Sequence, residues 1–336
     1  MYDVSQSRAT PVSRRNVLAG TGAALGMSII GQRAAHADFP DRQIKLVVPY
    51  PAGGGMDTIA RAISPKLAQS LGQTVVVENK SGGSGLIGIM EMVRAKPDGA
   101  TVLIHAMGFV MNAAMYRNLP YDPVKDVQPV ANIGFVPVVV AIGPNIPAKN
   151  LAEFIKLAKA DPKRYKGAAF ATGAGTLMLQ MFAKSAGIDM PIVQYRGTND
   201  AISATAGGEA DVVVMDGASV VPHIKAGRLK GLVVAGTSRL SEINDVPTTA
   251  EAGLPDFKLE FWYGAFVRKG TPMAAVERLN ADINKAALDP EVTERLKALL
   301  LTPANRNVSQ FESQWMSEMQ NWQDVLKKSD FKPMEL

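Results

Sequence analysis

The amino-acid sequence predicts an α/β fold in two lobes, with mainly parallel sheets joined by two crossover segments. Apolar strand-like runs alternate with helical patterns along the chain, which favours parallel sheets covered by helices. Two apolar runs, 130–142 and 259–267, are longer than the others and lie where a two-lobed chain would cross between its lobes. The 336 residues also exceed the size of one ordinary lobe.

The predicted strands are short, apolar and evenly distributed: 43–48, 74–78, 101–105, 130–142, 168–171, 192–195, 211–215, 230–235 and 259–267. The segments between them carry apolar stripes at helical spacing. Ile59, Ile63 and Leu67 recur every four residues and form one such stripe. Each stripe is suited to pack a helix against a sheet.

The first 37 residues have the pattern of an export signal. Arg14 and Arg15 form a twin-arginine motif, an apolar stretch follows, and Ala35-His36-Ala37 is an A-x-A cleavage site. The apolar stretch is short and glycine-rich for a membrane span, so an N-terminal anchor is the weaker alternative. We therefore expect a periplasmic protein cleaved after Ala37. The expected parts are a signal at 1–37, lobe 1 at 38–130 and 268–336, lobe 2 at 143–260, and hinge crossovers at 131–142 and 261–267.

The composition excludes several classes of function. The chain has no cysteine, which excludes disulfides, thiol catalysis and thiolate metal sites. The formal net charge of +5 owes much to the signal, which holds four of the 36 basic residues and one of the 31 acidic ones. The remaining 32 basic and 30 acidic residues nearly balance, so the charge gives no reason to expect binding to nucleic acid or to a membrane surface.

Motifs of known enzyme classes are missing. The sequence contains no G-x-S-x-G elbow, no P-loop, no H-E-x-x-H motif and no group of His and carboxylate residues at metal-ligand spacing. Outside the signal there are two histidines, and His105, which ends an apolar strand, is expected to be a structural histidine with its hydrogen bonds satisfied. We expect no enzyme, no cofactor and no metal. The rival from another class is an exported hydrolase or NAD-linked oxidoreductase.

The segment 49–57, PYPAGGGMD, follows the first strand and opens a helix. Its three glycines let the backbone approach a ligand closely. The helix start directs unpaired N–H groups and a positive dipole end toward whatever lies in front of it, which suits a carboxylate or phosphate. The candidate ligand-binding residues in this loop are Tyr50, Ala52, Gly53, Gly54, Gly55, Met56 and Asp57.

Similar loops follow later strands. Residues 83–88 match the G-x-G-x-x-G dinucleotide fingerprint, but they follow the second strand and the next strand ends without an acid for a ribose. An anion site or a plain glycine turn fits that loop better. Thr172 and Thr176 either cap helices or contact a ligand, and Asp216 either accepts a hydrogen bond from a ligand or holds the loop backbone. Arg196 is either a carboxylate clamp or a solvated side chain. The further candidates for ligand contact are Gly85, Phe109, Thr172, Gly175, Thr176, Tyr195, Gly197, Thr198 and Asp216.

These loops, in this order, resemble the periplasmic substrate-binding proteins of tripartite tricarboxylate transporters, the Bug receptors. The most specific segments are Ile44–Asp57 and Val75–Gly88, followed by 119–126, 195–198, 246–255 and 270–272. The resemblance implies a two-lobed periplasmic-binding-protein fold of the Venus-flytrap type II kind, with a deep cleft. It also implies a monomer that binds a small organic acid, largely through backbone N–H groups, and delivers it to membrane permease subunits. A ligand-loaded sensor for a signalling partner is the alternative.

The chain departs from the family pattern at several polar positions. Met56 stands where relatives usually have Thr, Leu86 where they have Asn, and Gly108-Phe109 where they have Thr-His. Each change replaces a hydrogen-bonding group by an apolar one. The sequence therefore predicts a less polar pocket, suited to an aromatic or otherwise apolar monocarboxylate or to an aromatic dicarboxylate.

Overall fold

The structure is a computed structural model that describes residues 39–170 and 173–327. Contacts divide the chain into a unit ending at Asp41 and a unit beginning at Arg42, and every helix and strand below belongs to the second unit. The predicted export signal and its cleavage site lie outside the described residues, as does Thr172.

The first group of strands is parallel. β1 (Ile44–Val48) lies between β2 (Val75–Asn79) and β3 (Thr101–Ala106). The helices α2 (Gly55–Leu71) and α3 (Leu86–Arg94) connect these strands in the order that the apolar stripes predict, with the single turn η1 (Gly83–Gly85) before α3. Because the strands are parallel, the glycine loops that follow β1 and β2 lie at the same edge of the sheet.

The second group of strands carries the central part of the chain. β5 (Gly167–Phe170) pairs in parallel with β6 (Ile192–Tyr195) and with β7 (Val212–Asp216). The other elements of this part are α5 (Leu151–Ala160), α6 (Gly173–Ala186), α7 (Thr198–Gly207), α8 (Gly217–Lys225), β8 (Lys230–Val234) and the turn η2 (Ser241–Ile243). Here too, helices start directly after the carboxyl ends of strands.

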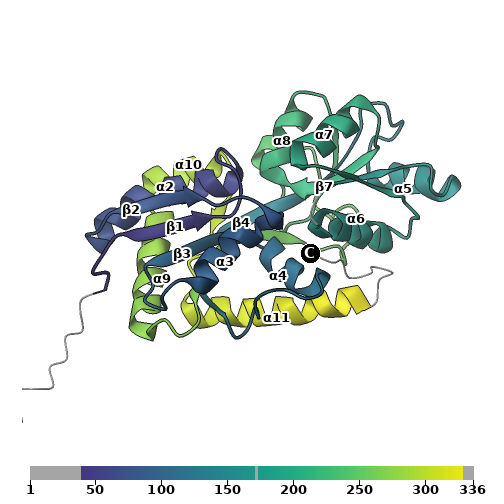
Figure 1. Cartoon of the computed structure of the whole chain (residues 1–336). Helices are drawn as coiled ribbons and strands as arrows, with labels where there is room; N and C mark the ends of the chain where they lie inside the picture. The colour runs from purple at the N-terminus through teal and green to yellow at the C-terminus, as the bar shows by residue number, and fades with distance from the viewer. Residues whose placement is uncertain (1–38, 171–172, 328–336) are drawn as a thin grey trace, which may run out of the picture. The chain divides into compact units, whose positions relative to one another are not determined.

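Two long strands connect the groups, as predicted. β4 (Val127–Ile142) pairs with β9 (Glu260–Arg268) as far as Pro137, and from Val138 onward it pairs with β7 and β8 instead. The strand order is β2-β1-β3-β9-β4-β7-β5-β6. Figure 1 shows β4 running from the β1–β3 group toward β7. The expected α/β class is confirmed, but the sheet is mixed, since β4 and β9 run antiparallel to their neighbours.

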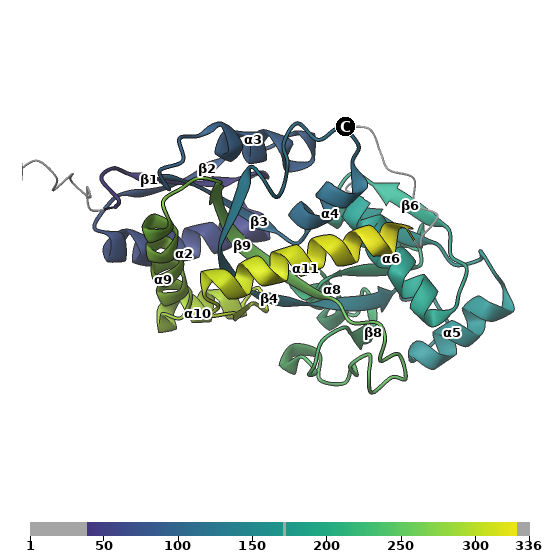
Figure 2. The ribbon, with the colours of Figure 1, turned by 90° about the horizontal axis from the view of Figure 1, so that it is seen from below.

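The C-terminal segments return to the first group of strands. They form α9 (Met273–Ala287), α10 (Pro290–Lys297), β10 (Thr302–Pro303) and α11 (Val308–Lys327). Figure 2 shows α11, in yellow, lying along β4 and next to α4 (Gly108–Met115). Beneath α11, the rings of Phe109, Phe266 and Trp315 pack with centroids 5.0 to 5.1 Å apart. Such aromatic contacts fix α11 and α4 against the crossover strands.

Candidate functional site

A cavity of about 750 Å³, called here the first cavity, lies where the carboxyl ends of β1, β3 and β7 meet the start of β9. This volume lies within the range of small-molecule sites. Nine of the residues predicted from the sequence line it: Tyr50, Gly53, Gly54, Gly55, Met56, Asp57, Gly197, Thr198 and Asp216. The structure thus brings together loops that are up to about 160 residues apart, between Tyr50 and Asp216.

Other predicted residues lie outside the lining of the first cavity. Phe109 is fully buried in the aromatic core under α11. Thr176 lies inside α6, where its hydroxyl accepts a hydrogen bond from Gln194 Nε2 at 3.4 Å. Gly175 packs against Phe170, where a Cβ would lie only 2.8 Å from its ring and its backbone nitrogen. Ala52, Gly85 and Tyr195 also lie outside the lining.

The starts of five helices line the first cavity. Each helix contributes its first or second residue: Gly55 from α2, Gly108 from α4, Ala174 from α6, Thr198 from α7 and Ala218 from α8. The first N–H groups of a helix have no partner within the helix, and the dipole places a partial positive charge there. Five such ends around one cavity create an environment that favours an anion.

The first glycine loop is held by Asp57. Its carboxylate is 4% exposed and accepts hydrogen bonds from the Gly53 N–H at 2.9 Å, from Asn79 Nδ2 at 3.0 Å and from Arg61 Nε at 3.0 Å. Burial works to raise the pKa of Asp57, but the hydrogen bonds from Arg61, Gly53 and Asn79 together lower it below its ordinary value. Asp57 therefore shapes the loop, and its oxygen atoms are already used by the protein.

Cationic side chains contribute little to the lining. Arg196 is the one cation among the described lining residues; its side chain is 95% exposed and lies 3.4 Å from Asp200. Asp216 caps α8, accepting hydrogen bonds from the Ser219 N–H and hydroxyl at 3.0 Å. Burial raises the pKa of Asp216 although these hydrogen bonds oppose the rise. Of the two roles that the sequence left open for Asp216, the structure shows the backbone-holding one.

The walls of the first cavity are apolar and aromatic. Met56 contributes from α2, as its sequence position predicts, and four further apolar side chains come from other elements: Phe170, Met178, Phe261 and Leu299. No sequence motif indicated Phe170 or Met178, because a strand end and a buried helix face carry no signal beyond hydrophobicity. A cavity with such walls favours a ligand with an apolar or aromatic body.

His105 also lines the first cavity, and here the sequence-based expectation is wrong. Its ring is 1% exposed, stacks on Phe109 with centroids 4.9 Å apart, and has an Nε2 atom without any hydrogen-bond partner in the described structure. Burial lowers the pKa of His105 to about 4, so the ring is neutral at pH 7. A histidine with one unsatisfied nitrogen is not the satisfied structural residue expected from an apolar strand.

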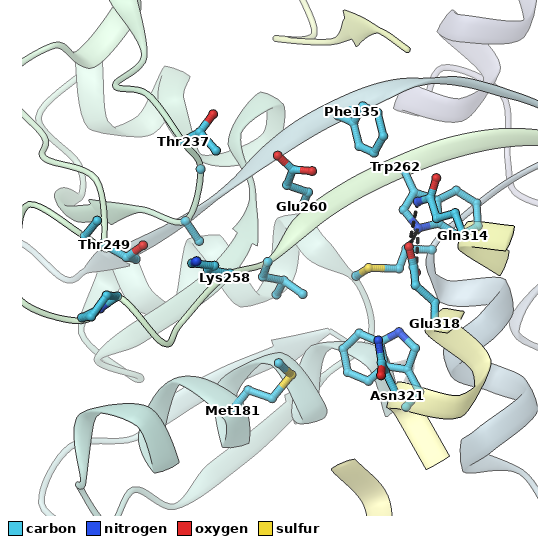
Figure 3. A pocket seen from close by; sticks show the side chains of 17 residues that line it. Phe135, Met181, Thr237, Thr249, Lys258, Glu260, Trp262, Gln314, Glu318 and Asn321 are labelled. Atoms are coloured by element: carbon cyan, nitrogen blue, oxygen red, sulfur yellow. Dashed lines mark hydrogen bonds between the residues drawn. The ribbon is translucent and has the colours of Figure 1, made fainter. Parts of the chain in front are cut away.

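A second cavity, of about 720 Å³, lies between α11, α6 and the segment that leads into β9. Figure 3 shows its side chains, with Glu318 accepting hydrogen bonds from Trp262 Nε1 at 2.7 Å and from Gln314 Nε2 at 2.7 Å. Met181 lies on the opposite wall, and Lys258 and Glu260 are exposed. Burial raises the pKa of Glu318, while its hydrogen bonds oppose that rise. Trp262 lines this cavity and not the first one.

The described residues contain neither a membrane-spanning helix nor a metal-binding cluster. Among residues 39–170 and 173–327, none of the helices combines the length and the hydrophobicity needed to span a bilayer. Within the same ranges, no group of three or more His, Cys, Asp or Glu residues is placed to hold a metal ion.

Comparison with known proteins adds independent information. Residues 59–331 match the model of the tripartite tricarboxylate transporter family receptor. A Pseudomonas sp. (strain P51) protein described as a UPF0065 protein in the tcbD-tcbE intergenic region is 37% identical over 318 residues, covering 94% of each chain.

Solved structures are similar over most of the chain as well. MatC from Rhodopseudomonas palustris with bound malate is 31% identical, with a TM-score of 0.75 over 86% of this chain and 100% of its own. A second R. palustris protein, with adipate, is 28% identical, with a TM-score of 0.78 over 88% of this chain and 100% of its own. The related structures include periplasmic binding proteins, so the predicted periplasmic-binding-protein fold is confirmed.

Proposed function

This chain belongs to the tripartite tricarboxylate transporter receptor family, and from that premise we propose that it captures a small organic acid in the first cavity and delivers it to membrane permease subunits. The family and the fold are those of solute-binding receptors and not of enzymes. We propose further that the chain is exported through its twin-arginine segment, acts in the periplasm and works as a monomer.

The observation that carries this proposal is the convergence of five helix starts on a cavity whose described lining residues include no buried cationic side chain. Backbone N–H groups then supply the positive potential for a carboxylate, and the exposed Arg196 contributes little. The second cavity is less suited to an acid, because none of its described lining residues is the first or second residue of a helix.

The ligand class follows from the walls. Met56, Phe170 and Phe261 provide apolar and aromatic surface, and related receptors have been solved with malate and with adipate. Malate carries a hydroxyl that needs polar partners, whereas adipate has an apolar chain between its carboxylates. We propose that this receptor prefers an aromatic or apolar carboxylate, with a carboxylate group at the glycine loop and the apolar body against these side chains.

Closure around the ligand would occur where β4 changes partners. Its pairing passes from β9 to β7 and β8 between Pro137 and Val138, opposite Glu260 at the start of β9. We propose that backbone rotation at these positions, within or next to the predicted crossovers 131–142 and 261–267, lets the parts on either side move together. Small-angle scattering should then show compaction when a ligand is added at saturation.

Titration calorimetry on the exported form of the chain tests the proposal. The panel contains benzoate and terephthalate as aromatic acids, adipate as an aliphatic one, and malate and citrate as polar ones. We expect one site per chain, with the aromatic acids and adipate bound at least about tenfold more tightly than citrate, because citrate would bury unpaired polar groups. Tight binding of citrate or malate alone would contradict the ligand class, and binding of none of the acids would contradict the function.

A further inference from the structure

His105 is the one histidine that lines the first cavity, and its two ring nitrogens have different surroundings. Nδ1 lies 2.8 Å from the Ala106 nitrogen, which donates its N–H to it, and 3.1 Å from the Ala106 carbonyl oxygen. Nε2 is buried and has no partner within the described residues. The two contacts of Nδ1 require opposite proton positions, so the shorter one decides between them.

The shorter contact makes Nδ1 an acceptor. A neutral imidazole carries one proton, and it must then lie on Nε2. Nε2 is therefore an N–H donor, buried at the cavity wall without an acceptor. Leaving a buried donor unpaired is unfavourable, and native structures rarely keep one without a functional reason.

The neighbours of the ring hold this donor in place. Phe109 stacks on one face of the ring, and the Tyr50 ring meets it edge-on at 5.8 Å. A Cβ added at Gly85, whose φ is +93°, would lie 3.4 Å from Nε2 and 3.3 Å from Tyr50 Oη. A side chain at Gly85 would therefore crowd both groups, and glycine also suits the positive φ there.

We infer that His105 is a specificity-determining residue whose Nε2–H donates a hydrogen bond to an oxygen of the bound organic acid. The inference rests on the proposed function and adds a side-chain donor to the backbone donors described above. Because the ring is neutral, it selects an acceptor at that point of the ligand without adding a positive charge. An acid that places a methyl or amino group there would leave the donor unpaired.

The tautomer is tested first, on the ligand-free protein, by NMR with ¹⁵N-labelled histidine. The expected result is a neutral His105 at pH 7 with its proton on Nε2. A proton on Nδ1, or a charged ring, would overturn the inference whatever the protein binds. This measurement does not depend on the proposed function.

Titration with benzoate or terephthalate follows, on the wild-type protein and on variants. We expect the Nε2 proton to shift on binding, His105→Phe to weaken binding about 10- to 100-fold, and His105→Gln, which keeps a donor near the same place, to retain most of the affinity. His223→Gln is the matched control, because His223 lies on α8 outside both cavities.

Three results separate the possible failures. If the acids bind but the Nε2 proton does not respond, or if His105→Phe binds as tightly as the wild type, the inference is wrong and the proposed function stands. If His105→Phe and His105→Gln lose affinity equally while both keep the wild-type melting temperature, the donor role is likewise refuted. If no acid of the panel binds to the wild type, the proposed function fails.

Discussion

Replacing Asp57 removes the group that fixes the first glycine loop. The Asp57→Ala protein loses the acceptor for the Gly53 N–H, for Asn79 Nδ2 and for Arg61 Nε. Arg61 is more than half exposed and regains water, so losing this ion pair contributes little. Asn79 is partly buried, and Gly53 bonds to a carboxylate that is 4% exposed, so these two hydrogen bonds are worth about 1–2 kcal/mol each.

The expected total is a loss of about 2–4 kcal/mol in the free energy of unfolding, measured by urea denaturation. The loop would also lose its fixed geometry before the start of α2, so calorimetry should show the best acid of the panel bound at least about tenfold more weakly. Asp122→Ala serves as the control. Asp122 also holds a loop, through the N–H groups of Val124 and Lys125, but it does not line the first cavity.

The pH dependence of stability gives a separate test of the same group. The pKa of Asp57 is lowered in the folded protein, so its contribution is full above the ordinary pKa of an aspartate and is lost as the pH falls toward the lowered value. The difference in stability between wild type and Asp57→Asn should shrink over that range. Asp57→Ala with wild-type stability would refute the anchoring role, and lost stability with unchanged affinity would show that the loop does not hold the ligand.

Further predictions concern both cavities. Gly54 has a φ of −77°, and a Cβ there would meet only Pro51 O at 3.7 Å. The Gly54→Val protein should therefore fold, with a loss of at most about 1 kcal/mol in the free energy of unfolding. Calorimetry should nevertheless show the acid bound at least about tenfold more weakly. Arg196→Ala should change that affinity less than about threefold, because the side chain is 95% exposed; abolished binding would contradict the backbone-donor account. Met181→Trp, which fills part of the second cavity, should leave the affinity unchanged, and a large loss would place the ligand there. The pKa of Glu318 is raised in the folded protein. The stability of the wild type, measured by urea denaturation, should therefore fall relative to that of Glu318→Gln as the pH rises above the ordinary pKa of a glutamate. Parallel pH profiles of the two proteins would contradict this.

Much of the fold was predictable from the sequence because its signals are local. Each predicted strand is present to within a few residues, since apolar runs and glycine turns fix both its existence and its ends. The two long runs at 130–142 and 259–267 are the crossover strands β4 and β9. Their antiparallel pairing was not predictable, because the direction of a strand within a sheet depends on distant partners. The lobe and hinge boundaries remain predictions.

The site was predictable where it rests on backbone. Glycines before a helix indicate donors, and Gly53 to Gly55 lie in the first cavity as expected. Side chains were harder, because burial decides their role. Phe109 was a candidate for ligand contact, yet its side chain is fully buried in the aromatic core. His105 looked like a core residue, and only the positions of Ala106 and the cavity show its unpaired nitrogen.

A crystal structure of the protein with the tightest-binding acid of the panel tests the central claim most directly. Our account predicts the ligand in the first cavity, with one carboxylate within hydrogen-bonding distance of the N–H groups of Gly54 and Gly55, and with its apolar body against Met56 and Phe261. A ligand seated in the second cavity, or a carboxylate held by Arg196 alone, would contradict it.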